Sequence, residues 1–591
     1  MRRETAAPSI QQRSEAVDGM RIDWDVPVIM TDGTVLRADV FRPDDDGRHP
    51  VVMTLGPYAK GLAFQDGFAG MWQNLAKNYP DALAGSSNKY QVWETVDPEK
   101  WVPDGYVCVR VDSRGAGRSA GQLDMWSQQE ARDYYDAIGW AGTQGWSNGR
   151  VGLLGISYYA ANQWLVASLR PPHLAAICPW EGFSDFYREG TRHGGILSRF
   201  SEAWAEYQIY TVQHGVGDRG TRSAVTGEPV AGPATLGEEE LRGNRVETMP
   251  EAKRRELLDE FHVAHTAVLE DIAVPVLSAA NWAHHLHTRG NFEGYRRAGS
   301  QRKWLEVHGH EHYAEFYTDY GVSLQKRFFG HFLKGEPTGW EQQPPVQLNI
   351  RHVDGTFESR DEQEWPLVRT RWTTFHLDAG TGALTETRPD AEGRTDFSAA
   401  DPRGATFWTA PFEEEVEITG PSAARVRLAS STVDTDLFVT LRVQDPEGHD
   451  VTLVSAIDPN GLLTVGWLRA SHRELDEDLS LPHRPWHRHT RKLPLEPGEP
   501  VTLDVEILPT SIVVPRGYRL GVTLTGCDFE APGDGPRPQL YGITMRGNGT
   551  FVHDDPDDRP AGIFDGSTTV FTGGTQGSQL LLPVIPRTAH Q

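Results

Sequence analysis

A serine at a predicted strand-to-helix turn is the first residue whose surroundings point to chemistry. Residues 151–159 read as an apolar strand, then Gly155, then Ser157 at the start of a helical pattern. Such a turn needs a small residue two positions before the serine, and it exposes the serine Oγ while the next backbone N–H faces a developing oxyanion. Tyr159 replaces the second glycine of G-x-S-x-G, so the short pattern also fits an ordinary turn. The strand before it and the helix after it favour Ser157 as a nucleophile and the Tyr158 amide as an oxyanion donor.

A serine hydroxyl becomes a strong nucleophile only when a neighbouring base takes its proton, and histidine is the usual base. His308, His310 and His312 alternate after the apolar run at 304–307. In the chain order nucleophile, acid, histidine, the base lies on the loop after the last strand. His312 is deepest in that loop, and we predict it as the base. Alternating histidines also suggest metal ligation, but no acidic or thiol cluster accompanies them, so we expect no metal.

A second oxyanion donor is available at Tyr58, which directly follows the apolar run at 51–55. Its phenol can donate to the oxyanion; alternatively its ring packs at the edge of the core and the hydroxyl donates to a backbone carbonyl. The glycines in 112–121 have the wrong spacing for a dinucleotide-binding loop, so we expect no nucleotide site.

The elements that must position these residues follow from the hydrophobic pattern. Two strands joined by a tight turn are predicted at 26–30 and 35–41. Continuous apolar runs separated by amphipathic stretches then indicate a parallel sheet covered on both faces by helices. These runs lie at 51–55, 106–111, 151–154, 174–178, 274–279 and 304–307. A helix with apolar residues at Leu324, Phe328 and Phe332 follows the last run.

Three composition changes divide the chain. Residues 183–269 interrupt the alternation and contain helical pieces at 201–210 and 250–260, so we expect an inserted helical cap over the sheet edge where ligands bind. Residues 335–345 are rich in Gly, Pro, Glu and Gln, as in a linker. Later segments alternate with period two between Pro and Gly turns. We therefore predict an α/β core at 1–182 and 270–340, a cap at 183–269 and an all-β sandwich at 341–591.

This order of segments resembles the CocE/NonD (cocaine-esterase-like) hydrolases, relatives of X-Pro dipeptidyl-peptidases and α-amino-acid ester hydrolases. The resemblance covers most of the chain and rests on residues 30–43, 56–60, 105–119, 145–152 leading into the serine, 434–438, 468–471 and 495–500. It implies an α/β-hydrolase domain with an inserted cap, a C-terminal jelly-roll β-sandwich, and hydrolysis of esters or amides without a cofactor. It also implies that Ser157 is the nucleophile, that His312 is the base, and that Tyr58 and the Tyr158 amide form the oxyanion hole.

The catalytic acid departs from the family pattern. The family places an aspartate in a Trp-x-Asp context after the strand at 274–279, whereas this chain has Trp282-Ala283-His284. A second imidazole cannot supply the negative charge that orients the base. Glu181 lies at the tip of the neighbouring strand and is our first candidate for a substitute, ahead of Glu293 and Glu311. Each of these glutamates is also consistent with a capping or salt-bridged carboxylate.

Substrate preference should come from the strand tips and the cap. If the strand assignments hold, Trp180, Trp282 and Tyr159 line a largely apolar cleft that favours an acyl or aromatic group. Acidic residues of the cap are compatible with an amino group, although a solvated helix face explains them equally well. These are Asp185, Glu189 and Glu202.

Composition excludes several other functions. The net charge of −25 over 591 residues disfavours nucleic-acid binding. Three scattered cysteines give no disulfide framework. The first twenty residues lack the apolar run of a secretion signal, and no membrane span is present, so we expect a soluble cytoplasmic protein. The sequence thus predicts a cofactor-free serine hydrolase acting on a small ester or amide. The alternatives are an acyl transferase or lyase on the same site, or a degenerate ligand-binding homologue.

Overall fold

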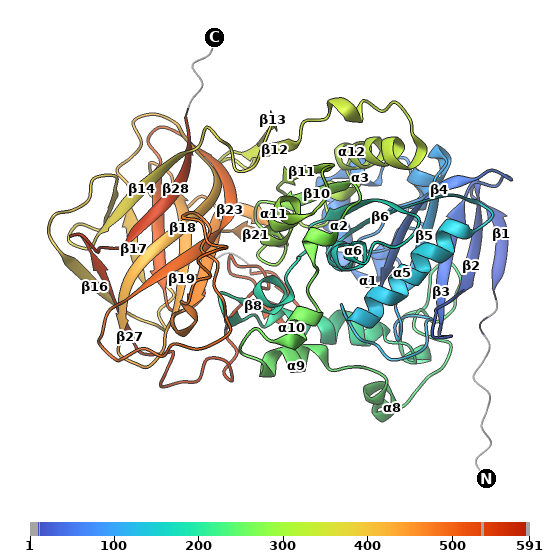
Figure 1. The fold of residues 1–591 in the computed structure, drawn as a ribbon, viewed down its shortest axis with the longest axis horizontal. Helices are drawn as coiled ribbons and strands as arrows, with labels where there is room; N and C mark the ends of the chain where they lie inside the picture. Colours follow the sequence, from blue (N-terminus) through green and yellow to red (C-terminus); the bar gives the residue numbers. More distant parts are fainter. Residues whose placement is uncertain (1–9, 11, 533–536, 587–591) are drawn as a thin grey trace.

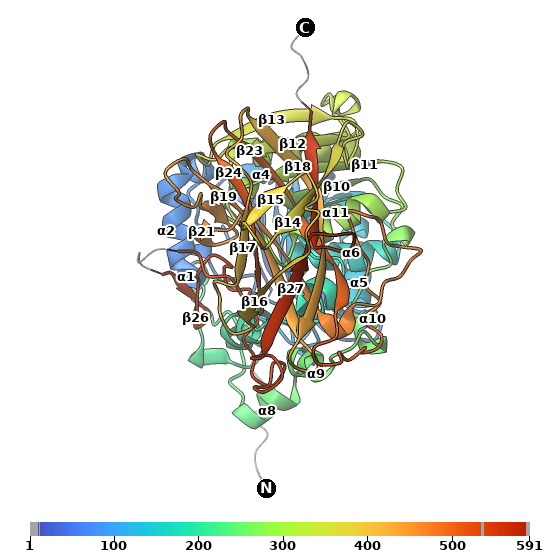
Figure 2. The same ribbon diagram turned by 90° about the vertical axis from the view of Figure 1, so that its left-hand side faces the viewer.

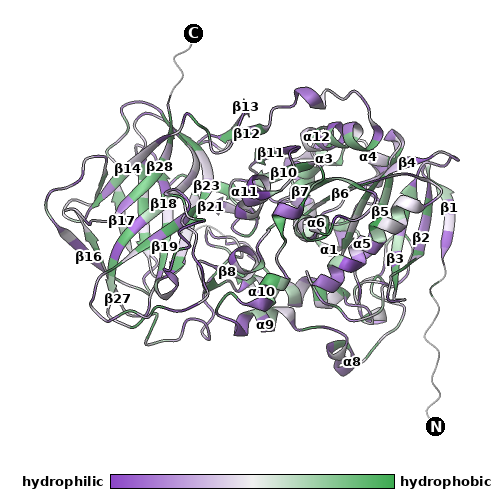
Figure 3. Ribbon diagram, in the orientation of Figure 1, coloured by the Kyte–Doolittle hydropathy of each residue, from purple (hydrophilic) through white to green (hydrophobic). Residues whose placement is uncertain are grey.

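Two β-sheets, one mixed and flanked by helices and the other all-β, form the two ends of the molecule (Figure 1). The computed structural model describes residue 10, residues 12–532 and residues 537–586. Apolar residues are concentrated on the strands of both sheets (Figure 3). Each sheet has its own hydrophobic core, and a third cluster lies where the two parts meet.

The first sheet has eleven strands in the order β1-β2-β3-β5-β4-β6-β7-β10-β11-β12-β13. They are β1 (Arg13–Val17), β2 (Met20–Ile29), β3 (Val35–Arg42), β4 (His49–Gly56), β5 (Val107–Asp112), β6 (Ser147–Ile156), β7 (Leu174–Trp180), β10 (Val276–Asn281), β11 (Lys303–His308), β12 (Val346–Arg351) and β13 (Phe357–Glu362). All the apolar runs predicted as strands are strands. Adjacent strands from β5 to β12 in this order are parallel. Their carboxyl ends therefore share one edge of the sheet, where open α/β sheets bind ligands.

Helices follow several of these strands and cover the sheet. The longer ones are α5 (Gln128–Thr143), α6 (Tyr158–Ser168), α11 (Thr288–Arg297) and α12 (Asp319–Phe329). α5 packs against β6, α6 against β7 and α11 against β10. α12 corresponds to the helix predicted from Leu324 and Phe328, both of which are buried. Short helices α1 (Phe64–Gly67), α2 (Ala69–Asn78), α3 (Pro80–Leu83) and α4 (Pro98–Trp101) fill the connection between β4 and β5.

The α/β part extends further along the chain than the sequence pattern indicated. We expected it to end at residue 340, but β12 pairs in parallel with β11, and β13 pairs with β12. The Gly- and Pro-rich stretch at 335–345 is therefore a connection inside this part, and the sheet runs to Glu362. Composition could not indicate this pairing, because a loop before a strand and an interdomain linker use the same residue types.

The predicted insertion lies between β7 and β10 and consists mainly of short helices. These are α7 (Phe200–Trp204), α8 (Glu238–Gly243), α9 (Thr248–Arg254) and α10 (Glu260–Ala264), together with the two-residue strands β8 (Arg192–His193) and β9 (Ile196–Leu197). A π-helical turn, Ala205–Ile209, continues directly from α7. In Figure 1, α9 and α10 lie on the lower side of the molecule between the two sheets, and α8 lies below the first sheet.

The C-terminal part is all-β, as predicted, and Figure 2 looks onto it from its own end of the molecule. Its main strands are β14 (Arg371–Asp378), β15 (Ala383–Thr385), β16 (Gly393–Ser398), β17 (Ala405–Trp408), β18 (Val416–Ser430), β19 (Asp436–Gln444), β22 (Thr464–Arg469), β23 (Val501–Val514), β24 (Arg519–Thr525), β27 (Ser567–Thr572) and β28 (Gln579–Ile585). β18 pairs with both β23 and β28, so the sheet closes on itself. Among the described helices, none is both long and apolar enough to cross a bilayer.

Candidate active site

Ser157 occupies the turn between β6 and α6 in a conformation that is rare for residues with a side chain. Its φ is 58° and its ψ is −111°, while its own N–H donates to the carbonyls of Trp180 and Glu181. Strained backbone of this kind is concentrated at functional sites. Tyr159 stands where the motif has its second glycine, and Gly155 leaves room for it. A Cβ at position 155 would lie 2.4 Å from the Tyr159 Cβ.

The two predicted oxyanion donors lie beside the serine. The N–H of Tyr158 is the first of helix α6, where a helix leaves its N–H groups without internal acceptors. The Tyr158 ring points away from the cavity, and its hydroxyl donates to Glu130 at 2.7 Å. Tyr58 is buried and lines the same cavity as Ser157. The structure therefore brings the Tyr58 side chain and the Tyr158 backbone to the serine.

The imidazole that contacts Ser157 is that of His287, with Nε2 3.1 Å from the serine Oγ. The backbone N–H of Phe183 donates to the Nδ1 of His287 at 3.1 Å. Because Nδ1 accepts a hydrogen bond, the neutral ring carries its proton on Nε2 and donates it to Oγ. Burial, followed by the nearby His312, lowers the pKa of His287 well below its usual value, so the ring stays neutral. Sequence reasoning assigned His287 no role.

His312, the predicted base, lies between two carboxylates. Its Nδ1 is 3.1 Å from Glu181 Oε2 and its Nε2 is 3.0 Å from Glu94 Oε1. Burial alone would lower the pKa of His312, but the two carboxylates outweigh it and raise the pKa to about 9. The structure thus brings Glu181 to His312, as expected, and adds Glu94, which no sequence pattern indicated.

Both carboxylates are fully buried, yet they titrate differently. Burial raises the pKa of Glu94 to about 7 against the opposing effect of His312. For Glu181, burial is outweighed by His312 and His308, which lower its pKa to about 2. Glu181 is therefore the fixed negative charge of the site, whereas Glu94 changes charge near neutral pH.

The other two histidines of the alternating run lie outside the serine's cavity. His308 links Glu181 to Glu306 through contacts of 2.9 and 2.7 Å. Burial opposes its charge, but Glu306 and Glu181 outweigh it and raise the pKa of His308 to about 10. His310 contacts Glu315 at 2.8 Å. A charged His308 supports the negative charge of Glu181, which in turn faces the predicted base.

A different histidine cluster has the composition of a metal site. His284, at the position of the family's aspartate, lies beside His287 and His312, and one ring nitrogen from each comes within 4.8 Å of the others. Such sets bind transition metals when each ligating nitrogen is bare and the other nitrogen donates to an acceptor. His287 has the opposite arrangement, since its Nδ1 accepts from Phe183. The cluster therefore suits hydrogen bonding to Ser157 better than metal ligation.

The three residues expected to line a substrate cleft are in the core instead. Trp180 is fully buried and stacks on His308 with ring centroids 5.1 Å apart. Trp282 donates from Nε1 to the Asn349 carbonyl at 2.7 Å. Tyr159 packs over Gly56 and Gly155. None of the three is among the described residues that line the serine's cavity, because each points into the sheet–helix core rather than toward the sheet edge.

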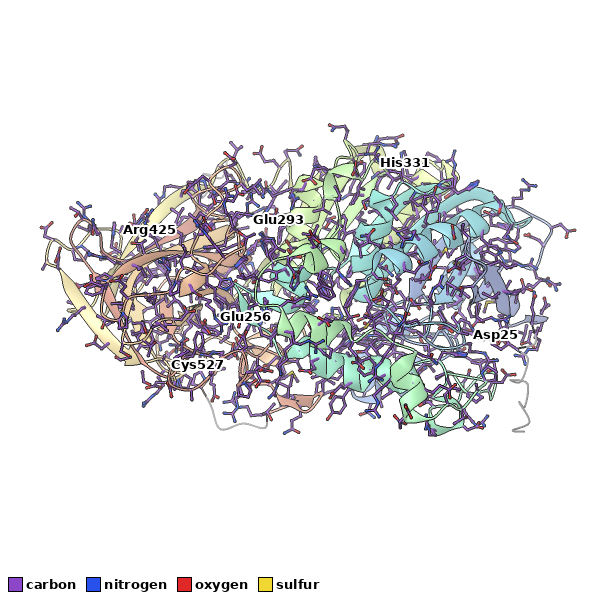
Figure 4. The ribbon with its side chains drawn as sticks, turned by 60° about the horizontal axis from the view of Figure 1, so that its bottom comes forward. Asp25, Glu256, Glu293, His331, Arg425 and Cys527 are labelled. Carbon is purple, nitrogen blue, oxygen red and sulfur yellow. The ribbon has the colours of Figure 1, made fainter. Side chains whose placement is uncertain are left out.

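The other acidic candidates hold the structure together. Glu293, labelled in Figure 4, contacts Arg296 at 2.9 Å and Arg484 of the all-β part at 3.0 Å. Glu311 accepts hydrogen bonds from Asn74 and Tyr79 and faces away from His312. The cap acids have cationic partners of their own. Asp185 pairs with Arg188, Glu189 with Arg289, and Glu202 with Lys253.

Two adjacent cavities lie beside the serine. The inner one, of about 40 Å³, is lined by Ser157, His284, His287, His312 and Glu94, among others. The outer chamber, of about 690 Å³, lies between α2, the π-helical turn of the cap and loops of the all-β part. The residues that line both are Tyr58, Met71, Gln208, Ile457, Leu540 and Tyr541.

A serine in a strained strand-to-helix turn, with helical amides behind it and buried histidines and carboxylates around it, defines a serine hydrolase. Comparisons with known proteins agree. Residues 32–314 match the X-Pro dipeptidyl-peptidase (S15 family) model, and residues 338–581 match the X-Pro dipeptidyl-peptidase C-terminal non-catalytic domain. A CocE/NonD family hydrolase from Staphylococcus aureus superposes with a TM-score of 0.83 at 30% identity, covering 98% of this chain and 97% of that one. The chain belongs to the CocE/NonD family of hydrolases.

Curated relatives are also similar over nearly their whole length. Cocaine esterase from Rhodococcus sp. (strain MB1 Bresler) is 25% identical over 97% of this chain and 100% of its own. A putative serine esterase from Mycobacterium tuberculosis (strain CDC 1551 / Oshkosh) is 26% identical over 88% of this chain and 93% of its own. A solved α-amino acid ester hydrolase shares the fold, with a TM-score of 0.67 at 17% identity over 98% of this chain and 99% of that one.

Proposed function

We propose that this protein hydrolyses an ester or amide bond through an acyl-enzyme on Ser157, without a cofactor, and that its closed all-β part is a jelly-roll-type accessory domain. The observation that carries the proposal is the strained Ser157 turn, which faces a cavity lined by Tyr58, His287 and His312. A positioned nucleophile, a base and oxyanion donors are the parts that acyl transfer to water requires.

The steps follow from the positions of the groups. Ser157 Oγ bonds to the carbonyl carbon while its proton passes to the Nε2 of His312, and the oxyanion is held by the Tyr158 N–H and the Tyr58 hydroxyl. His312 then protonates the leaving group, and the carbonyl re-forms as the acyl-enzyme. Water attacks with His312 again as base, and the proton returns to Oγ as the acid product leaves. Glu181 stabilises the imidazolium throughout.

The resting arrangement contains one feature that must change during this cycle. The Nε2 of His312 faces Glu94 at 3.0 Å, so it must leave Glu94 to reach Ser157. Below about pH 9 the pair of His312 and Glu94 binds at least one proton, because their pKa values are raised to about 9 and about 7. Loss of that proton frees Nε2 for the serine.

The outer chamber indicates the kind of substrate. Five aromatic side chains line it: Tyr58, Phe68, Tyr207, Tyr313 and Tyr541. Among the described lining residues, Glu311 is the only one that is acidic, basic or a histidine. Aromatic faces and a carboxylate attract cations and repel anions. We therefore propose esters or amides that have one bulky group, neutral or cationic rather than anionic.

A fluorophosphonate probe tests the nucleophile directly, with Ser157→Ala as the control. The probe should label the wild-type protein in the range of about pH 7 to 10, where the base loses its proton, and should not label the variant. Hydrolysis of p-nitrophenyl esters should disappear in parallel. Equal labelling of both proteins, or hydrolysis that persists in Ser157→Ala, would overturn the proposal.

A further inference from the structure

Three imidazoles line the inner cavity, and two of them, His287 and His312, have different hydrogen-bond partners. We propose that His287 is a catalytic hydrogen-bond donor that keeps its Nε2 proton throughout the cycle and stabilises Ser157 Oγ when that atom becomes a leaving group. This inference rests on the proposed acyl-enzyme mechanism and adds a residue that the sequence pattern did not indicate.

The backbone fixes which nitrogen of His287 carries the proton. The Phe183 N–H lies 3.1 Å from Nδ1, and a backbone N–H is always a donor. Protonation of Nδ1 would set two donors against each other in a buried position. His287 is 1% exposed, so water cannot relieve that conflict. The proton is therefore on Nε2, which faces Ser157 Oγ at 3.1 Å.

The groups packed around His287 oppose a positive charge on its ring. His284 and His312 lie at ring-centroid distances of 4.3 and 5.6 Å, and Phe183 stacks at 6.2 Å with an interplanar angle of 11°. Glu181 is the nearby carboxylate, and it already contacts His312 and His308. A neutral imidazole that donates one hydrogen bond is thus the stable form. Neutral histidines act as electrophilic donors in other enzymes when their surroundings prevent protonation.

His312 has the surroundings that a base needs. Its Nδ1 faces the ionised Glu181, so its Nε2 is the nitrogen that exchanges a proton with the serine. With the Nε2–H of His287 donated to one lone pair of Oγ, the hydroxyl proton is free to point toward His312. The two histidines therefore divide the work: His312 moves the proton, and His287 binds the oxygen.

This division predicts which step suffers most when His287 is lost. During acylation Oγ is the nucleophile, and a donor on its lone pair gives little assistance. During deacylation the bond from Oγ to the acyl carbon breaks, electron density returns to Oγ, and the Nε2–H stabilises it until His312 delivers the proton. Removal of His287 should therefore slow deacylation more than acylation.

The test compares His287→Ala with His287→Gln, whose side-chain amide N–H can replace the donor. His287→Ala should lower kcat about 100-fold, within the range seen when an oxyanion-type donor is removed, and should give a burst of p-nitrophenol near one equivalent per enzyme. His287→Gln should recover at least about tenfold of that loss. The pH at which activity is half-maximal should be the same in all three proteins, because His287 does not titrate.

Controls separate this idea from the mechanism on which it rests. Thermal unfolding of each variant controls for folding. His310→Gln controls for the general loss of a histidine, because His310 contacts Glu315 outside the cavity. If His287→Ala and His287→Gln lose fluorophosphonate labelling equally, or if the pH limb shifts, His287 is the base and the inference is overturned. Hydrolysis that survives in Ser157→Ala would instead overturn the acyl-enzyme mechanism.

Discussion

The Nε2 of His312 lies 3.0 Å from a carboxylate oxygen of Glu94. This is the nitrogen that a catalytic base would direct at its serine. Both side chains are buried, and the pair holds at least one proton throughout the physiological pH range, because the pKa of His312 is raised to about 9. In the proposed mechanism this protonated pair is the less active state, and the carboxylate that stabilises it has no counterpart in a simple serine–histidine–acid triad.

Activity should consequently rise with pH to an unusually alkaline plateau. The pKa of His312 is raised to about 9, so the imidazolium persists on the acid side and the neutral base appears as pH increases through that value. We expect kcat/KM to be half-maximal near pH 9 in buffers of constant ionic strength. Glu94→Gln removes one carboxylate and should shift the midpoint toward acid by about one pH unit or more. A wild-type midpoint at the ordinary histidine value would contradict this.

Glu181 should act as the orienting acid. Glu181→Gln keeps the shape but removes the charge that faces both His312 and His308, and turnover should fall by roughly 100- to 10,000-fold, the upper figure being the loss known from a serine protease. Glu293→Gln is the matched control, because this buried glutamate contacts Arg296 and Arg484 rather than a histidine.

The control should lower the midpoint of thermal unfolding and leave turnover within a few-fold of wild type. The two variants must therefore separate on a plot of turnover against thermal midpoint. Unchanged turnover in Glu181→Gln would reject the role of this carboxylate.

Tyr58 should contribute through its hydroxyl alone. Its ring packs edge-on against Tyr158 and Tyr159, with centroids 5.8 and 5.5 Å away, and Tyr58→Phe preserves that packing. Loss of one oxyanion donor should reduce kcat by about 100-fold with little change in KM. Steady-state kinetics on one ester measures both constants, and a purely structural tyrosine would leave kcat unaltered.

Glu311 should select for charge in the outer chamber. A choline-type ester and its neutral dimethylbutyl isostere differ only in charge, and the cationic member should have the higher kcat/KM, by about three- to tenfold for one partly exposed carboxylate. Glu311→Gln should equalise the pair. A preference that survives this substitution would place the charge recognition elsewhere.

Local signals account for what the sequence predicted well. The strand, the small residue and the helix around Ser157 are contiguous, so their pattern alone indicates the turn. Glu181 could be placed near His312 because parallel strands end at one edge, and β7 lies directly between β6 and β10. The first inference needs only the contiguous pattern, and the second needs only the order of the strands.

The remaining site residues depend on geometry that no local pattern encodes. His284, His285 and His287 lie within four residues, and the turn after β10 decides which ring reaches Ser157. Glu94 lies in a long connection between short helices, and no strand precedes it to place it at the sheet edge. Trp180 was expected at the edge because it ends β7, but the pleat of the strand turns its side chain into the core.

Leu540 and Tyr541 close the serine's cavity from a short hairpin, β25 (Gln539–Leu540) and β26 (Ile543–Thr544), of the C-terminal part, whereas Ser157 and its histidines come from the first sheet. Substitutions in this hairpin can therefore change which substrates fit the cavity, while the residues that break the bond are preserved. For the same reason, a library randomised at these few positions is the economical starting point for re-engineering selectivity.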